Sequence, residues 1–308
     1  MAHKVSVFGA GNVGAETARR IIEKKLADVV LVDIIPGIPQ GKALDMLQSG
    51  PVEGFDCKIK GTNDPADIDG SDVVVVTAGI ARKPGMSRDD LQAVNANIVR
   101  GITENISKYA PKSIIIMVTN PLDVMTYLAW KVSGFEKRKV FGMAGELDTA
   151  RMIAFISMET GVPSSKIKAM VLGGHGDLMV PLASQTTVNG KPLSSLLSRE
   201  KIEAIIKRTA NGGAEIVELL KAGSAYYAPS ASAVKMVEAV IKNKGTVIPS
   251  AVILDGEYDL KDVCIGVPAK IGKNGIEKVI ELKLPDEDRL MLERSANSVK
   301  ENIAKLKI

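Results

Sequence analysis

Histidine and cysteine are scarce in this sequence, and their scarcity narrows the chemistry that it can perform. The 308 residues include two histidines and two cysteines. Cys57 and Cys264 lie far apart and form no CxxC pair or Cys/His cluster, so neither a disulfide framework nor a metal site is expected. Since His3 stands almost at the first residue, chemistry that needs a group titrating near neutral pH depends on His175.

The sequence also lacks blocks of one charge and long apolar runs. The net charge is +4, and the 40 basic and 36 acidic residues are interspersed, which argues against nucleic acid as a partner. No apolar run approaches the length of a membrane span. The first strand, expected from Lys4, leaves no room for a signal peptide, so we expect a soluble, cytoplasmic protein without membrane contact.

What the first half does contain is a regular alternation of short β-branched runs and helical periods. Runs that are apolar almost throughout are typical of parallel strands covered on both faces. We therefore expect an α/β fold whose N-terminal part is a Rossmann-type parallel sheet with helices on both faces. The expected strands are 4–10, 28–33, 72–79 and 113–120, and the expected helices are 13–25, 40–48, 88–109 and one opened by Pro121.

The second half has a different rhythm, which predicts a C-terminal α+β catalytic domain with antiparallel strands. An Asn189-Gly190 pair predicts a hairpin turn within residues 184–193. The change of rhythm places the domain boundary near residue 144, giving domains 1–144 and 145–308. Further strands are expected at 166–174, 246–254, 263–272 and 276–282, and helices at 199–220, 230–242 and from Pro285.

The stretch GAGNVG, residues 9–14, fits the GxGxxG pattern of dinucleotide-binding loops. It follows a buried strand and opens a helix. Gly9 permits a tight turn, Gly11 lets backbone amides approach a pyrophosphate, and Gly14 allows close helix–strand packing. Asp33, at the end of the next strand, is placed to bind ribose hydroxyls and to repel a 2′-phosphate. The pattern predicts NAD rather than NADP, with a ligand-free glycine turn as the alternative.

Two further stretches carry charged side chains in suggestive places. Residues 78–91 leave the C-terminal end of a parallel strand and contain Arg82 and Arg88 around a Pro-Gly pair. Such a loop is either a mobile cover over a ligand or a solvated surface loop. Asp148 and Arg151 are three residues apart on one helix face, where an exposed ion pair is the plain alternative.

Several longer motifs together resemble the lactate/malate dehydrogenase family. GAGNVG, RKPGMSRDDL, VTNPLDVMTYLAWKVSG, LDTAR, GGHGDLMVPL and AGSAYYAPSAS occur in the order and at the spacing of that family. The resemblance extends from residue 4 to the last helix and is strongest to the malate-specific branch of the lactate-dehydrogenase-like type. It implies reversible hydride transfer between (S)-malate and NAD, giving oxaloacetate and NADH.

The resemblance also implies roles for individual side chains. His175 would be the general base in malate oxidation and the acid in the reverse reaction. Asp148 would orient the imidazole and stabilise its protonated form. Arg151 would bind the C1 carboxylate as a fork, and Arg88 would polarise the keto oxygen. Asn120 would hydrogen-bond near the reacting oxygen and the nicotinamide ribose.

Substrate choice is expected to depend on Arg82. The resemblance places a glutamine at this position in lactate enzymes and an arginine in malate enzymes, where it pairs with the second carboxylate. Ala225, small where lactate enzymes tend to carry threonine, agrees with that interpretation. A lactate or broader 2-hydroxyacid dehydrogenase is the alternative, and a catalytically silent NAD-binding scaffold is a third possibility.

The resemblance implies a larger cofactor-binding set and a homo-oligomer, with a homotetramer favoured and a homodimer as the alternative. The expected NAD-binding residues are Gly9, Gly11, Asn12, Val13, Gly14, Asp33, Thr77, Ala78, Gly79, Asn95, Val118 and Asn120.

Two departures from the family pattern stand near the expected catalytic residues. Glu146 occupies a position usually held by valine or asparagine, where a carboxylate would raise the pKa of the histidine or face a subunit partner. Met152 and Ile153 replace a frequent Phe-Arg pair, which puts in doubt an anion site at a subunit interface.

Overall fold

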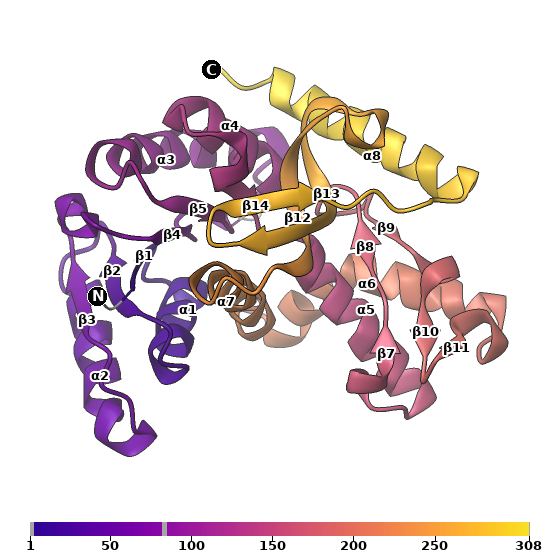
Figure 1. Cartoon of the computed structure of the whole chain (residues 1–308), viewed down its shortest axis with the longest axis horizontal. Helices are drawn as coiled ribbons and strands as arrows, with labels where there is room; N and C mark the ends of the chain where they lie inside the picture. Colours follow the sequence, from indigo (N-terminus) through magenta and orange to yellow (C-terminus); the bar gives the residue numbers. More distant parts are fainter. Residues whose placement is uncertain (1–2, 82–84, 308) are drawn as a thin grey trace.

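A nine-stranded sheet runs through the centre of the molecule (Figure 1). The structure is a computed structural model that describes residues 3–81 and 85–307. The strand order is β14-β13-β12-β6-β5-β4-β1-β2-β3. The strands are β1 (Lys4–Phe8), β2 (Asp28–Val32), β3 (Ile59–Thr62), β4 (Val73–Val76), β5 (Ile114–Met117), β6 (Val140–Gly142), β12 (Thr246–Asp255), β13 (Lys261–Gly272) and β14 (Gly275–Val279).

Six neighbouring strands of the sheet are parallel to one another. Their spatial order, β3-β2-β1-β4-β5-β6, is the Rossmann order 3-2-1-4-5-6. This confirms the fold class expected from the sequence. Strands β3 and β6 were not predicted. Both are short, and β3 contains Gly61, where a Cβ would lie 2.0 Å from the Pro39 carbonyl oxygen. Close packing of Gly61 against the backbone of α2 (Ile38–Glu53), rather than a run of β-branched residues, therefore distinguishes β3.

Helices cover both faces of the parallel strands, as the apolar runs predicted. Alternate residues of β4 point to opposite faces, with Val73 and Val75 in one core and Val74 and Val76 in the other. The first core includes Ile21 and is covered by α1 (Asn12–Glu23) and α7 (Tyr227–Ile241). The second is covered by α3 (Arg88–Tyr109) and α4 (Leu122–Ser133), while α2 packs on β3 (Figure 1).

The C-terminal antiparallel strands continue the parallel sheet. Strand β12 reaches β6 through one antiparallel pair, Ala251 with Gly142, and β13 and β14 follow as antiparallel neighbours. A Cβ at Gly142 would lie 2.6 Å from the Thr126 hydroxyl oxygen, so glycine permits this junction. The three predicted antiparallel strands are confirmed. Because one sheet passes through both halves, the division into domains 1–144 and 145–308 stays a prediction.

The expected single strand at 166–174 is wrong. The chain forms two short strands in different sheets, β7 (Ile167–Lys168) with β10 (Thr187–Val188) and β8 (Val171–Leu172) with β9 (Val180–Pro181). After β7 the chain turns under α5 (Gly145–Thr160), where the Val171 amide donates to the Thr149 hydroxyl. The apolar pattern is continuous across this turn, so the sequence did not reveal it.

The predicted hairpin at Asn189-Gly190 is confirmed. It connects β10 to β11 (Lys191–Pro192), and φ is positive at both turn residues, 51° and 80°. The helices α3 and α6 (Arg199–Leu220) have the predicted bounds, and the serine before each accepts a capping hydrogen bond. Helix α8 (Asp286–Ala304) follows Pro285 and packs on α4, β9 and β13. Among the helices of the described ranges, none combines the length and apolar character of a membrane span.

Candidate active site

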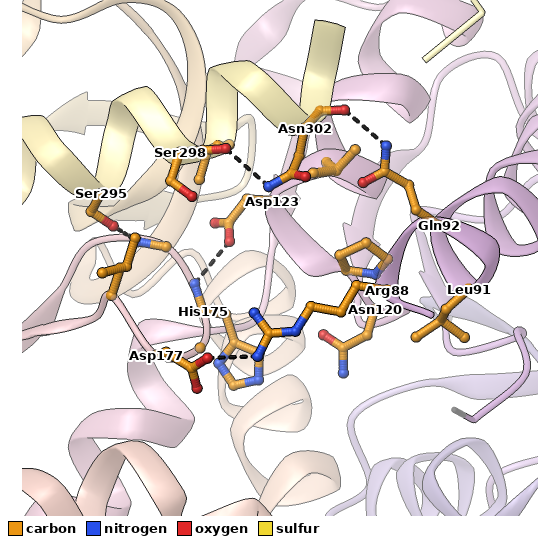
Figure 2. Close-up of a pocket in the computed structure, with 16 residues that line it drawn as sticks. Arg88, Leu91, Gln92, Asn120, Asp123, His175, Asp177, Ser295, Ser298 and Asn302 are labelled. Atoms are coloured by element: carbon orange, nitrogen blue, oxygen red, sulfur yellow. Dashed lines mark hydrogen bonds and ion pairs between the residues drawn. The ribbon is translucent and has the colours of Figure 1, made fainter. Parts of the chain in front are cut away.

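The predicted catalytic residues gather where parallel strands β4 and β5 end. The loop of residues 173–177, between β8 and β9, reaches this edge and carries His175. A pocket of about 370 Å³ opens there, and Arg88, Asn120 and His175 line it together with residues of α8 (Figure 2). This is the position at which open α/β sheets bind their ligands.

His175 and Asp148 form a pair in which the carboxylate is buried and the imidazole is 18% exposed toward the pocket. The Nδ1 atom of His175 lies 2.9 Å from Oδ2 of Asp148, and the carboxylate, in the first turn of α5, is 2% exposed. Burial is the largest single effect and lowers the pKa of His175, but the carboxylates of Asp148 and Asp123 together raise that pKa above its ordinary value. Because Nδ1 donates to the carboxylate, Nε2 is the ring nitrogen available to exchange a proton with a ligand.

Arg151 lies beside this couple. Its Nη1 atom is 3.4 Å from Oδ1 of Asp148, and its side chain is 13% exposed. The predicted alternative of an exposed surface ion pair is therefore wrong. Burial lowers the pKa of Arg151 and Asp148 partly opposes that effect. Within the described ranges the buried Nε atom of Arg151 has no hydrogen-bond partner, and the side chain lies against Gly212 and Gly213 of α6.

Arg88 reaches the histidine loop from the first residue of α3. Its Nη2 atom lies 2.6 Å from Oδ2 of Asp177, and both side chains are exposed. The contact confirms that Arg88 stands at the pocket and shows that Asp177, which the sequence analysis did not single out, holds it there (Figure 2). Arg82 lies outside the described residues.

The glycine loop has the geometry that a dinucleotide requires. Gly9 has a φ of 99°, and a Cβ at Gly14 would lie 1.8 Å from the Gly9 carbonyl oxygen. A Cβ at Gly11 would instead meet open space, and no side chain caps the N-terminus of α1 there. The backbone amides of Asn12 and Val13 thus begin a helix whose positive end is open to a phosphate, so these residues fit an NAD pyrophosphate.

Asp33 lies directly against the glycine loop. Its Oδ2 atom accepts the Ala10 amide at 2.6 Å and its Oδ1 atom accepts the Ile35 amide at 3.0 Å. These bonds fix the carboxylate while leaving lone pairs for ribose hydroxyls. Lys42 also reaches the loop, donating to the Ala10 carbonyl at 2.7 Å. The structure therefore places Asp33 where the sequence predicted a ribose-binding acid.

The other predicted cofactor residues surround the same edge of the sheet. Thr77 donates its hydroxyl to the Phe8 carbonyl at 2.9 Å, and Ala78 and Gly79 follow it out of β4. Val118 and Asn120 follow β5. Asn95 is 1% exposed, and its amide bonds to the backbone of Ile80 and Asn120. Asn95 thus joins two loops of the site, and its direct contact with a cofactor stays a prediction.

Two residues that hold the histidine loop were not singled out from the sequence. Asp123 and Ser295 are buried beneath the histidine loop and accept hydrogen bonds from the His175 and Gly174 amides. The one signal was Asp123 itself, a carboxylate inside the largely apolar run of residues 122–129. For Ser295 the sequence contained no signal, because its partner is the backbone of a segment 121 residues away.

Glu146, Met152 and Ile153, which depart from the family pattern, each contact other parts of the chain. Glu146 forms an ion pair with Lys235 of α7, and the charged groups that act on the pKa of His175 are Asp148, Asp123 and Arg151. Met152 is fully buried in an apolar cluster against which Ile153 packs. The interface alternatives for these residues stay predictions.

A Rossmann-type sheet, an open glycine loop with an acid at its edge and a His–Asp–Arg cluster define the class of nicotinamide-dependent dehydrogenases. An imidazole in this arrangement can exchange a proton, and a guanidinium can bind an anion. The dinucleotide when bound supplies the acceptor or donor of a hydride.

Comparison with known proteins agrees with this class. The family model of the lactate/malate dehydrogenase NAD binding domain matches residues 3–142, and that of the alpha/beta C-terminal domain matches residues 145–307. A malate dehydrogenase of Roseiflexus sp. is 55% identical over 307 residues, covering 100% of this chain and 99% of the relative.

Solved structures are also similar over the whole chain. A malate dehydrogenase of Cryptosporidium parvum has a TM-score of 0.97 at 44% identity and covers 100% of this chain and 99% of its own. A lactate dehydrogenase of the same organism, with lactic acid and nicotinamide adenine dinucleotide, has a TM-score of 0.96 at 44% identity, covering 99% of this chain and 98% of its own. The chain belongs to the lactate/malate dehydrogenase family and is an NAD-dependent oxidoreductase.

Proposed function

We propose that the protein interconverts (S)-malate and oxaloacetate with NAD as cofactor. The observation that carries the chemistry is the His175–Asp148 pair beside Arg151. Substrate choice is supported by identities of 52 to 55% to curated malate dehydrogenases and by Arg82 in the sequence. Lactate chemistry remains the alternative, because similar structures include lactate dehydrogenases.

The proton steps follow from the geometry of His175. In malate oxidation its Nε2 atom accepts the hydroxyl proton while the C2 hydrogen leaves with its electron pair for the nicotinamide. Asp148, which holds Nδ1, stabilises the resulting imidazolium. In oxaloacetate reduction the same atom returns the proton to the carbonyl oxygen, so one group serves both directions.

The arginines of the site bind and orient the substrate in this proposal. Arg151 binds the C1 carboxylate, and Arg82 binds the second carboxylate. Arg88 polarises the reacting oxygen, which requires it to exchange its exposed contact with Asp177 for the substrate. Asn120 adds a hydrogen bond near that oxygen, since it lines the same pocket.

The two reaction directions should show opposite dependence on pH. Because the pKa of His175 is raised, the imidazolium needed for reduction is present below that pKa and is lost as pH rises through it. The kcat/KM for oxaloacetate should therefore fall on the alkaline side, while the kcat/KM for malate should rise. The pH profiles of kcat/KM for both reactions, measured in one buffer series, test this expectation. An increase in the rate of oxaloacetate reduction with rising pH would contradict it.

The position of Asp33 should enforce a preference for NADH. A carboxylate beside the 2′-position repels a phosphate, so we expect kcat/KM with NADH to exceed that with NADPH by at least about a hundredfold, roughly 2.7 kcal/mol. Asp33→Gly should narrow the ratio, whereas Asp28→Asn at the other end of β2 should leave it unchanged. Equal rates with the two cofactors in the unaltered protein would rule out this role.

We further infer a cytoplasmic homotetramer, with a homodimer as the alternative. Support for self-association comes from α2, where Leu44, Leu47 and Val52 are 56%, 47% and 86% exposed. Apolar side chains gathered on one exposed helix favour burial against another chain. Light scattering coupled to gel filtration measures the assembly, and a monomeric mass would contradict the inference.

The proposed reaction is tested by identifying its product. Incubation with oxaloacetate and NADH should yield (S)-malate, resolved from its enantiomer by chiral chromatography, with one NADH consumed per malate formed. The matched reaction with pyruvate controls for general 2-oxoacid reduction. Formation of (R)-malate, or NADH consumption with pyruvate alone, would refute the proposal.

A further inference from the structure

The backbone that carries His175 is fastened by two buried side chains from distant parts of the chain. Oδ2 of Asp123, from α4, accepts the His175 amide at 2.8 Å, and the Ser295 hydroxyl, from α8, accepts the Gly174 amide at 2.8 Å (Figure 2). Asp123 is 5% exposed and Ser295 is 1% exposed. The loop therefore has one charged and one neutral anchor.

The charged anchor is an unusual choice for a backbone amide. A neutral acceptor such as Ser295 suffices for this purpose, whereas a buried carboxylate loses hydration. The Oδ1 atom of Asp123 has no hydrogen-bond partner among the described residues, so its desolvation is not fully compensated. Burial raises the pKa of Asp123 to about 6, against the opposing effect of His175. The presence of a carboxylate at this buried position indicates that the negative charge of Asp123 has a function.

We propose that Asp123 is a positioning residue for proton transfer, which fixes the His175 backbone and acts with Asp148 as a second carboxylate that stabilises the imidazolium. The two carboxylates come from different helices, α4 and α5; Asp148 contacts the ring at Nδ1 and Asp123 contacts the backbone amide of the same residue. Asp148 holds the ring at Nδ1, while Asp123 acts on it through space and through the loop. The inference rests on the proposed function, in which His175 exchanges the proton.

The other charged or titratable groups near Asp123 and Asp148 either disfavour the protonated form of His175 or leave its stability unchanged. On α5, Arg151 disfavours it. On α3, Arg88 is paired with Asp177 of the loop. On β13, burial and the neighbouring Asp123 raise the pKa of the Cys264 thiol well above its ordinary range, so that thiol stays neutral. Asp123 and Asp148 both favour the charged histidine.

A matched pair of variants separates charge from anchoring. Asp123→Asn keeps an oxygen acceptor for the His175 amide but loses the charge, whereas Ser295→Ala removes a neutral anchor and keeps the charge. We expect Asp123→Asn to move the alkaline limb of oxaloacetate reduction down by about half a pH unit or more, roughly a threefold loss of kcat/KM above the limb. Ser295→Ala should lower kcat without moving the limb.

Nuclear magnetic resonance gives a readout that does not depend on turnover. With two histidines in the chain, His3→Asn leaves the His175 imidazole as a single signal to titrate. It should titrate above the ordinary histidine pKa and show a second inflection as Asp123 protonates. The Asp123→Asn exchange should lower the first midpoint and abolish the second.

The outcomes distinguish this inference from the proposed function. The inference would be overturned if a folded Asp123→Asn protein kept both the alkaline limb of oxaloacetate reduction and the titration midpoint of His175 unchanged. If that variant does not fold, a single His175 inflection within the ordinary range in the His3→Asn protein would overturn it equally. Titration as expected in a protein that does not reduce oxaloacetate would instead refute the proposed function and leave the electrostatic coupling standing.

Discussion

Replacing His175 with asparagine should lower turnover of oxaloacetate by about two to four orders of magnitude while NADH still binds. The loss follows because asparagine has no titrating group, although its amide can still bond to Asp148. The glycine loop and Asp33 belong to other segments and keep their geometry. Steady-state kcat and the NADH dissociation constant, measured by fluorescence, give the two quantities.

His3→Asn is the matched control for that variant. His3 is half exposed and bonds to Asp72 beside the start of β1, at the opposite end of the strand from the glycine loop. Its replacement should leave kcat almost unchanged. Most of the activity surviving in His175→Asn, or a comparable loss in His3→Asn, would show that the proton-transfer group lies elsewhere.

Arg82→Gln should produce the second large effect, on the choice of substrate. A guanidinium that faces a methyl group is left charged and unpaired in a closed site, whereas glutamine offers pyruvate a neutral contact. Losing a charge-assisted pair costs on the order of 2 to 5 kcal/mol where water is excluded, so oxaloacetate activity should fall by several decades. Some activity with pyruvate should appear, limited by loop closure.

Arg151→Gln distinguishes the two carboxylate sites. Both substrates carry the C1 carboxylate, so this variant should reduce activity with oxaloacetate and with pyruvate alike, because Arg151 contacts the Asp148 that pairs with His175. The measurement is kcat/KM for both substrates in the unaltered protein and both variants. An unchanged oxaloacetate-to-pyruvate ratio in Arg82→Gln would show that this arginine does not select the substrate.

The fold could be predicted from the sequence where local signals and tertiary packing agree. Helices α3 and α6 begin after Ser87 and Ser198, which cap them, and their predicted bounds are those of the structure. The prediction of a single strand over residues 166–174 was wrong, because its two ends pair with different partners. Such pairing depends on segments remote in the chain, which a local pattern does not contain.

The same distinction holds at the site. His175, Asp148 and Arg151 could be singled out because they stand in recognisable motifs and can exchange a proton or bind an anion. The structure brings the three together. Asp123 lies 52 residues from His175 in the sequence, and its carboxylate accepts a hydrogen bond from the His175 amide only because the chain folds the two together. The pairing of Arg88 with Asp177 likewise depends on the start of α3 and the histidine loop meeting at the pocket.

The most direct test of the account compares oxaloacetate with pyruvate as substrates of the unaltered protein at saturating NADH. The account predicts that kcat/KM for oxaloacetate exceeds that for pyruvate by several decades, because only the dicarboxylate engages both Arg151 and Arg82. Equal values, or a preference for pyruvate, would contradict it and establish the lactate alternative within the same family.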